Sequence, residues 1–276
     1  MGEQQSWAGG PFLGFDTETT GVSPADDRIV SVALVERDGR GTRARTWLID
    51  PGIEIPAAAS AIHGITTEHV RAHGRDPAGA LSEIAGALAD ALHSGVPVVA
   101  FNACFDLTLL DAELTRHGLP TLSSRRGGPA RPVLDPLVLD RAIARYRPGK
   151  RRLADLCAVY DVTPQAGLHS AEVDVVATLD ILAAIAERHP EIASMPVEQV
   201  HTWQVTAHRA WAENFNAWRR SQGYAGTGAT TWWPTAVLAI PRRGTATDLG
   251  PRAGRSSAPR WSSARRAGGT PSNPPR

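Results

Sequence analysis

The feature that most constrains the fold is a pair of acidic residues directly after a short apolar run. Residues 12–15 (FLGF) form the run, and Asp16 and Glu18 follow it with one threonine between them. Side chains two positions apart in a strand project from the same face, so both carboxylates point to one side of a buried strand. At ~4 Å such charges repel by about 4 kcal/mol at an effective dielectric near 20, so a fold keeps them where positive charge lies between them. A divalent cation with oxygen ligands fits that requirement, although an Asp-x-Glu pair alone does not establish a metal site.

Apolar runs and periodic patterns predict an α/β domain around this strand. Three strands joined by short connections are expected near the start of the chain, as an antiparallel meander. They are residues 12–15, 29–35 and 43–49. Two further strands (96–101 and 133–135) alternate with helical patterns at residues 66–70, 78–92, 106–117, 153–160 and 171–188. This order predicts a mixed sheet, with a meander followed by parallel strands and with helices on its faces.

Two more segments carry acidic residues where sites collect in such a fold. The segment NACFD (102–106) follows a predicted strand and opens a helix, so Asp106 lies at the carboxyl end of the sheet. In HSAEVD (169–174), Ser170 is a suitable helix N-cap, with His169 in the loop before it and Asp174 one turn inside. An imidazole beside a metal-binding carboxylate is a good general base near neutral pH. Taken singly, each segment also fits an ordinary helix start or a surface histidine.

Together, FDTETTG (15–21), NACFD (102–106) and HSAEVD (169–174) resemble the three motifs of the histidine-type DEDD exonucleases in order and spacing. The spacing of His169 and Asp174 matches this branch, whereas the tyrosine-type branch would need tyrosine at position 170, which is serine here. The segment IHGIT (62–66) is similar to one in the proofreading epsilon subunits of bacterial DNA polymerase III. The resemblance covers about residues 11–190.

The resemblance implies a ribonuclease H-like fold and a 3′→5′ exonuclease that uses two divalent metal ions, Mg²⁺ or Mn²⁺. Asp16, Glu18, Asp106 and Asp174 would hold the metals, and His169 would deprotonate the attacking water. Two ions about 3.5–4 Å apart can serve both the water and the leaving oxygen. The expected substrate is the 3′ end of single-stranded or frayed DNA, degraded to nucleoside 5′-monophosphates in a proofreading or repair role.

The resemblance also indicates residues that contact the nucleic acid. Thr17 and Thr19 would line the pocket of the terminal nucleotide. His63 and Ile65 would pack against its base or sugar, with a plain turn as the alternative for His63. Many relatives carry histidine where this chain has Phe101, which preserves packing but not a hydrogen bond to the substrate. The expected substrate-binding set is Thr17, Thr19, His63, Ile65, Asn102 and Arg151.

Charge is distributed unevenly along a chain whose formal total is only +1. Residues 241–276 hold eight arginines and one aspartate, whereas the first 240 residues carry 21 basic and 27 acidic side chains. The tail is rich in proline, glycine and serine, so we expect disorder there, as a solvated appendage or a loose nucleic-acid contact. A basic cluster between the second and third motifs could grip phosphates or form a solvated loop. Its members are Arg145, Arg147, Lys150, Arg151 and Arg152.

A tryptophan-rich extension follows the predicted domain. Its apolar residues recur at intervals of three and four, which predicts an amphipathic helix. They are Val200, Trp203, Ala207, Trp211, Phe215 and Trp218. This stripe either packs back on the α/β domain or docks a partner or a second copy of the chain. The predicted organisation is a flexible segment (1–10), an exonuclease domain (11–190), a helical extension (191–240) and a disordered basic tail (241–276).

Other features limit the location and the partners. The chain has no run of 18 apolar residues, so we expect no membrane span. It has only two cysteines, and its first residues lack the basic and apolar segments of a secretory signal, so we expect a cytoplasmic protein. The expected partners are nucleic acid and a DNA polymerase or repair complex.

Two alternative functions stay open. One is an exoribonuclease of the ribonuclease T or oligoribonuclease type, because the choice depends on contacts to one 2′-OH. The other is a non-catalytic nucleic-acid-binding module.

Overall fold

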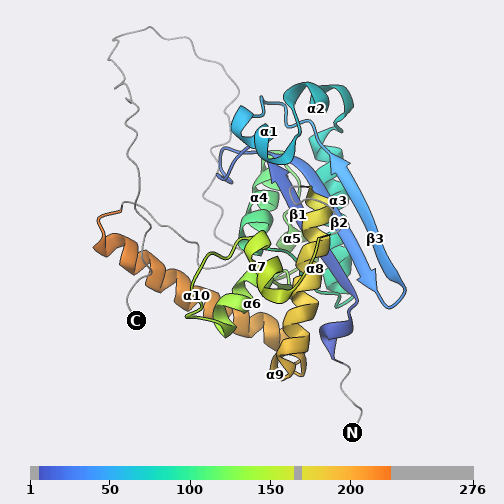
Figure 1. Cartoon of the computed structure of the whole chain (residues 1–276). Coiled ribbons are helices and arrows are strands. Elements are labelled where there is room, and N and C mark those ends of the chain that lie inside the picture. Colours follow the sequence, from blue (N-terminus) through green and yellow to red (C-terminus); the bar gives the residue numbers. More distant parts are fainter. Residues whose placement is uncertain (1–5, 165–169, 225–276) are drawn as a thin grey trace. The chain divides into compact units, whose positions relative to one another are not determined.

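The chain forms a five-stranded mixed sheet with helices on both faces, seen in a computed structural model that describes residues 6–164 and 170–224 (Figure 1). The strand order is β3-β2-β1-β4-β5. The strands are β1 (Phe12–Thr19), β2 (Ile29–Asp38), β3 (Gly41–Leu48), β4 (Val98–Val99) and β5 (Val133–Leu134). β1, β2 and β3 pair antiparallel, whereas β1, β4 and β5 pair parallel. The predicted α/β ribonuclease H-like sheet, a meander followed by parallel strands, is confirmed.

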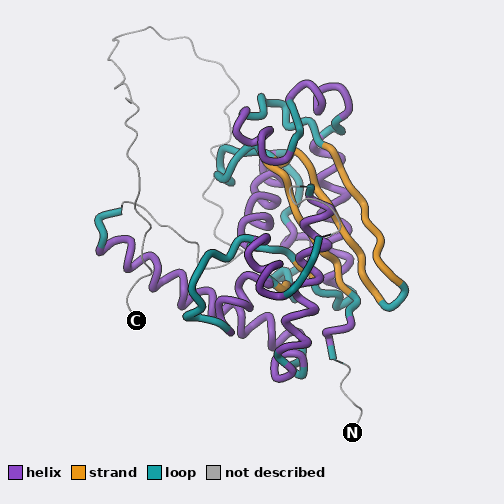
Figure 2. The backbone as a smooth tube through the Cα atoms, viewed as in Figure 1, coloured by secondary structure: helices purple, strands orange, loops and turns teal. Residues whose placement is uncertain are grey.

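The helices cover both faces of the sheet, as the tube in Figure 2 shows. They are η1 (Trp7–Gly9), α1 (Ala57–His63), α2 (Thr67–His73), α3 (Pro77–His93), α4 (Ala103–Arg116), α5 (Leu122–Arg126), α6 (Pro136–Ile143), α7 (Leu153–Tyr160), α8 (Ala171–Arg188), α9 (Pro190–Ala193) and α10 (Val197–Ser221). The sequence patterns located α2, α3, α4, α7 and α8, but not the short helices α1, α5, α6 and α9. The strand expected at residues 96–101 is only two residues long.

β1 is the central strand, and it continues through the acidic pair rather than ending before it. β2 pairs with β1 along its whole length, whereas the parallel pairing with β4 is confined to Leu13 and Gly14. The last residues of β1 therefore run beyond β4, toward the point where α4 begins. This offset places Asp16 and Glu18 at the carboxyl end of the parallel strands, where α/β folds form their sites.

Two apolar layers hold the sheet. On one face, residues such as Phe15 and Leu34 pack in a buried cluster with α3 and α4. On the other face, Val35 and Leu134 pack with α7 and α8. Burial of these large side chains supplies most of the free energy that opposes chain entropy.

Gly14 allows α8 to lie directly on β1. A Cβ atom at position 14 would lie 2.3 Å from Cγ1 of Val175 and 3.2 Å from Cδ1 of Leu179, so a larger residue would force the helix away. Asp16 and Glu18 are on the same face of β1 as Gly14, because side chains alternate along a strand. The glycine therefore brings the first turn of α8, with Asp174, close to the acidic pair.

α10 packs along α6 and against β5, the edge strand of the sheet. The residues it buries are Val200, His201, Gln204, His208, Ala212 and Asn216, most of which are polar. The predicted aromatic stripe is only half-buried, apart from Val200, and its rings stack on one another, with 5.3 Å between the ring centroids of Trp211 and Phe215. The extension does pack on the α/β domain, but mainly through its polar side. In residues 6–164 and 170–224, no helix is both long enough and apolar enough to cross a membrane.

Candidate active site

Three carboxylates from two distant segments meet at the end of β1. Asp16 and Glu18 come from the strand, and Asp174 comes from the first turn of α8. One oxygen of each can be chosen so that all three lie within 4.8 Å of one another, an arrangement that could hold a metal ion. The family resemblance implied this convergence, and Gly14 explains how the helix comes close enough.

Asp106 lies beside this group, but its hydrogen-bond partner comes from the opposite face of β1. It is buried in the first turn of α4, with 4% of its surface exposed. The hydroxyl of Thr17 donates a hydrogen bond of 2.6 Å to its Oδ1 atom. Thr17 points to the face of β1 opposite to Asp16 and Glu18. The hydroxyl that was expected to line the nucleotide pocket is thus directed at a carboxylate.

Burial and the charges of neighbouring carboxylates raise the pKa values of three carboxyls of the site. The pKa of Asp16 is raised well above its usual value by burial, and then by the charges of Asp106, Glu18 and Asp174. Burial, followed by the charges of Asp174 and Asp106, raises the pKa of Glu18 to about 7. Burial raises the pKa of Asp106 to about 7, against the lowering effect of the Thr17 hydrogen bond. A cluster of carboxylates that are at least partly buried requires positive charge, and oxygen donors of this kind suit Mg²⁺ or Mn²⁺.

A fifth acidic residue, Asp135, supports the start of α4 and was not predicted as functional. Its carboxylate accepts hydrogen bonds from the backbone N–H groups of Asn102 (3.1 Å) and Ala103 (2.9 Å). It also accepts from the N–H of Leu137 (2.9 Å), as the N-cap of α6. The sequence carried a signal, because Asp followed by Pro marks a helix start. Its link to α4 is a tertiary contact that no local pattern shows.

The residues expected around the terminal nucleotide lie at the same end of the sheet. The Thr19 hydroxyl donates to the carbonyl oxygen of Gly21 at 2.7 Å, within the turn after β1. His63 accepts a hydrogen bond at Nδ1 from the N–H of Ile65 (3.1 Å). Burial lowers the pKa of His63, and the neighbouring backbone of Thr19 opposes that shift. His63 is thus adjacent to Thr19, whereas Ile65 packs in a small apolar cluster with Ile55 and others.

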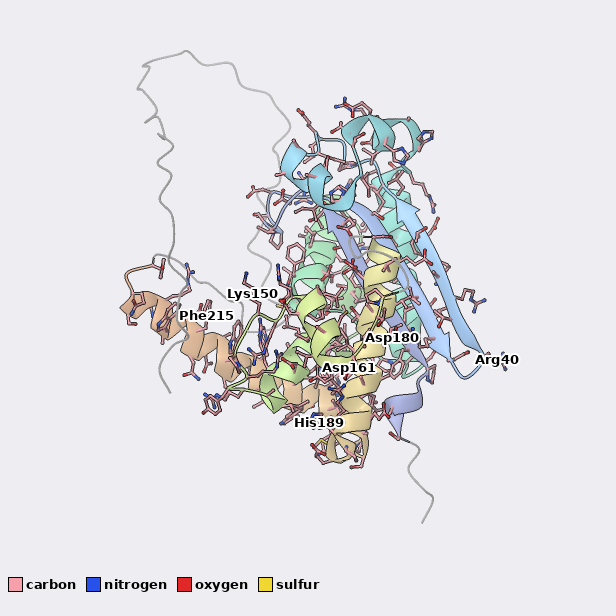
Figure 3. All side chains as sticks on the ribbon, in the orientation of Figure 1. Arg40, Lys150, Asp161, Asp180, His189 and Phe215 are labelled. Carbon is pink, nitrogen blue, oxygen red and sulfur yellow. The ribbon has the colours of Figure 1, made fainter. Side chains whose placement is uncertain are left out.

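The basic cluster divides into engaged and exposed members. Arg151 donates from Nε to Oδ2 of Asp140 (2.8 Å), and Arg147 donates to the same oxygen (2.6 Å). Arg152 forms an ion pair with Asp155. Lys150 is exposed on the loop between α6 and α7, where Figure 3 shows it. Asn102 is also exposed, whereas His169 lies outside the described residues.

Comparisons with known proteins show what the chain is similar to. A family model described as Exonuclease (RNase_T) matches residues 13–182. The DNA polymerase III subunit epsilon of Treponema pallidum is 31% identical over 183 residues, which cover 64% of this chain and 77% of that protein. A DNA polymerase III subunit epsilon-like protein of Rhodobacter capsulatus is 33% identical over 173 residues, or 61% of this chain but only 23% of that protein.

Solved structures show the same fold. Exonuclease I of E. coli, in complex with a dA16 oligonucleotide, superposes with a TM-score of 0.56 at 22% identity, over 72% of this chain and 43% of that one. Exonuclease I of Methylocaldum szegediense gives a TM-score of 0.55, also at 22% identity, over 75% of this chain and 45% of that one. With acidic residues converging as the motifs predicted and the family model spanning most of the sheet and its helices, the chain belongs to the exonuclease (RNase_T) family.

Proposed function

We propose that the chain is a metal-dependent 3′→5′ exonuclease that hydrolyses phosphodiester bonds at the 3′ end of single-stranded or frayed DNA and releases nucleoside 5′-monophosphates. The observation that carries this proposal is the meeting of Asp16, Glu18 and Asp174, with ligand atoms within 4.8 Å, in a chain of the exonuclease family. The names of the relatives and the DNA bound to the E. coli structure support DNA as the substrate class.

We infer that two divalent cations, Mg²⁺ or Mn²⁺, occupy the site. The donor set fits them, since all four side chains are carboxylates, and burial together with neighbouring charges raises the pKa of Asp16, Glu18 and Asp106 when no cation is bound. Asp16, Glu18, Asp106 and Asp174 would hold the two ions. When bound, such ions activate a water molecule and stabilise the leaving oxygen. Four carboxylates and two divalent ions leave the site near neutral, so a polyanionic strand can enter.

The chain's own groups would position the substrate and move the proton. His169 precedes α8 in sequence, and as a general base it would take the proton of the attacking water. His63 and Thr19 would border the terminal nucleotide, because His63 lies beside Thr19, the last residue of β1. Lys150 and Arg145 form no ion pair among the described residues and would be available to phosphates, whereas Arg151 would first have to leave Asp140.

The names of the relatives also support a partner. We propose that the chain works with a DNA polymerase or a repair complex in the cytoplasm, since matched proteins are called DNA polymerase III subunits. Size-exclusion chromatography of the chain with a replicative polymerase subunit tests the association, and co-elution at micromolar concentration is the expected result.

The activity is tested with a single-stranded DNA oligomer labelled at its 5′ end. With Mg²⁺, we expect a ladder that shortens one nucleotide at a time from the 3′ end, and no products in EDTA. Asp174→Asn should abolish the ladder, while Glu172→Gln, an exposed acid in the same turn of α8, should not. A phosphorothioate at the 3′-terminal linkage should slow the wild-type reaction.

The same assay separates the alternatives. A matched RNA oligomer degraded faster than DNA would identify an exoribonuclease instead. Products that start inside the oligomer would identify an endonuclease. Binding of the oligomer without hydrolysis at any concentration of Mg²⁺ or Mn²⁺ would refute the catalytic proposal and leave a binding module.

A further inference from the structure

The outer edge of β5 is closed by side chains rather than by another strand. Inside the sheet, the carbonyl oxygens of Pro132 and Leu134 accept hydrogen bonds from the N–H groups of Val98 (3.1 Å) and Ala100 (3.2 Å) in and beside β4. The backbone groups of Val133 and the N–H of Asp135 therefore face outward, because alternate residues of a strand point to opposite neighbours. Buried backbone groups of this kind need partners.

Gln204 and His201 of α10 supply those partners, and the N–H of Val133 donates to Nδ1 of His201 at 3.2 Å. The Oε1 atom of Gln204 accepts from the N–H of Asp135 at 3.0 Å, and its Nε2 atom donates to the carbonyl oxygen of Val133. One primary amide therefore makes the two bonds that a peptide group of a neighbouring strand would make. His201, one turn earlier on α10, has Nδ1 2.9 Å from the same carbonyl oxygen. Gln204 has no exposed surface, so water does not replace it.

Asp135 connects the edge of the sheet to the active site through its hydrogen bonds. Its backbone N–H is bonded to Gln204, while its carboxylate accepts from Asn102 and Ala103, the residues that begin α4. Asn102 has the left-handed conformation (φ 62°, ψ 42°), which asparagine adopts more readily than other non-glycine residues, and Asp135 accepts from the backbone N–H groups on both sides of the Asn102 Cα atom. Asp106 lies in the first helical turn after this point, so its carboxylate moves with the start of α4.

We propose that Gln204 is a positioning residue of the active site, which fixes the start of α4 through Asp135 and thereby places the carboxylate of Asp106. The proposal rests on the proposed function, because Asp106 is taken to hold a cation. Gln204 lies outside residues 13–182, the part matched by the family model, so this support comes from the extension of the chain. Removing a residue that orients a metal ligand typically weakens metal binding by about 10- to 100-fold.

Gln204→Met tests the proposal in the full-length chain, since methionine has a similar length but makes neither bond. Gln199→Met is the matched control, because Gln199 is exposed on the same helix. The first measurement is hydrogen exchange of backbone amides, well below the melting temperature. We expect faster exchange at Asn102 and Ala103 in Gln204→Met, with β1 and β2 unchanged, and no effect in the control.

The second measurement is Mn²⁺ binding in the absence of nucleic acid, followed by electron paramagnetic resonance. We expect Gln204→Met to weaken Mn²⁺ binding by about tenfold, the lower end of the range for residues that orient metal ligands. The double variant Gln204→Met/Asp135→Asn should bind Mn²⁺ no more weakly than Asp135→Asn alone, because Gln204 acts through Asp135. If Gln204→Met does not fold, Gln204→Glu, which can still accept from Asp135, is measured in its place and should show a smaller change.

Two results would overturn the positioning role. One is unchanged exchange at residues 102 and 103. The other is a uniform rise in exchange together with wild-type Mn²⁺ affinity, which would mean that Gln204 only stabilises the fold. If the wild-type chain binds Mn²⁺ and responds as expected but degrades no oligomer, the proposed function fails and the positioning role stands. If the wild-type chain does not bind Mn²⁺, the proposed function fails, and the exchange measurement alone decides the role of Gln204.

Discussion

Removing the charge of Glu18 should stabilise the metal-free protein, although Glu18 is placed to bind metal. Its pKa is about 7 in the folded chain, against an ordinary value of 4.5, because burial and the charges of Asp174 and Asp106 disfavour ionisation. The folded state therefore prefers the protonated form. Above pH 7 the residue is ionised in both states, and its ionisation lowers the free energy of unfolding. Below about pH 4.5 Glu18 is protonated in both states and does not change the free energy of unfolding.

The size of the effect follows from the shift. A change from 4.5 to about 7 corresponds to about 3 kcal/mol at roughly 1.4 kcal/mol per unit. Solvent screening of a partly exposed side chain reduces this to about 2 kcal/mol. For a folded unit of this size, a gain of about 2 kcal/mol raises the melting temperature by roughly 4–8 °C. Glu18→Gln removes the charge and keeps the shape, so it should show that gain at pH 8.

The assay is thermal unfolding of the full-length chain in EDTA, followed by circular dichroism at pH 8 and pH 4. Glu18→Gln should melt higher than wild type at pH 8 and at nearly the same temperature at pH 4. Glu213→Gln, at an exposed position in the middle of α10, is the control and should change neither value. Saturating Mg²⁺ should stabilise wild type more than Glu18→Gln. A lower melting temperature at pH 8, or an equal gain at both pH values, would refute the electrostatic account.

Three further perturbations test other parts of the site. Thr17→Val removes a hydrogen bond that lowers the pKa of Asp106, so the Mg²⁺ concentration for half-maximal cleavage at pH 7 should rise; an unchanged metal titration would contradict this role. His169→Ala should lower turnover by roughly 10²–10⁴-fold, as for a general base, with Mn²⁺ binding intact, and a wild-type rate would remove it from that role. Deleting residues 241–276, with their eight arginines, should weaken DNA binding most at low salt and flatten the salt dependence, unless the tail makes no contact with DNA.

The sequence predicted those parts of the molecule that short-range rules control. Alternation along β1 placed Asp16 and Glu18 on one face, and the helix start at Ser170 placed Asp174 in a first turn. Meeting of the two segments could be expected only from the resemblance, since the close approach of α8 depends on Gly14. The conformation of Asn102 and its bond to Asp135 could not be predicted, because the two residues are adjacent only in the folded sheet.

Periodicity was least informative in the extension. The spacing of aromatic residues indicated the helix correctly, but of the predicted stripe only Val200 is fully buried. Gln204 and His201 are buried instead, because the edge of β5 presents backbone groups that only polar side chains can satisfy. Arg151 shows the same limit: the pattern of basic residues is compatible with phosphate binding, but the buried carboxylate of Asp140 provides its partner in the fold.

The closed edge at β5 sets the shortest piece of this protein that is worth producing. A fragment cut after α8, near the end of the family match, would lose Gln204 and His201 and leave the N–H of Asp135 and the carbonyl of Val133 without their partners. Uncovered strand edges invite pairing with other chains, so such a fragment should form aggregates at concentrations where the longer chain stays monodisperse. Expression boundaries for this protein therefore belong beyond Ser221, the last residue of α10.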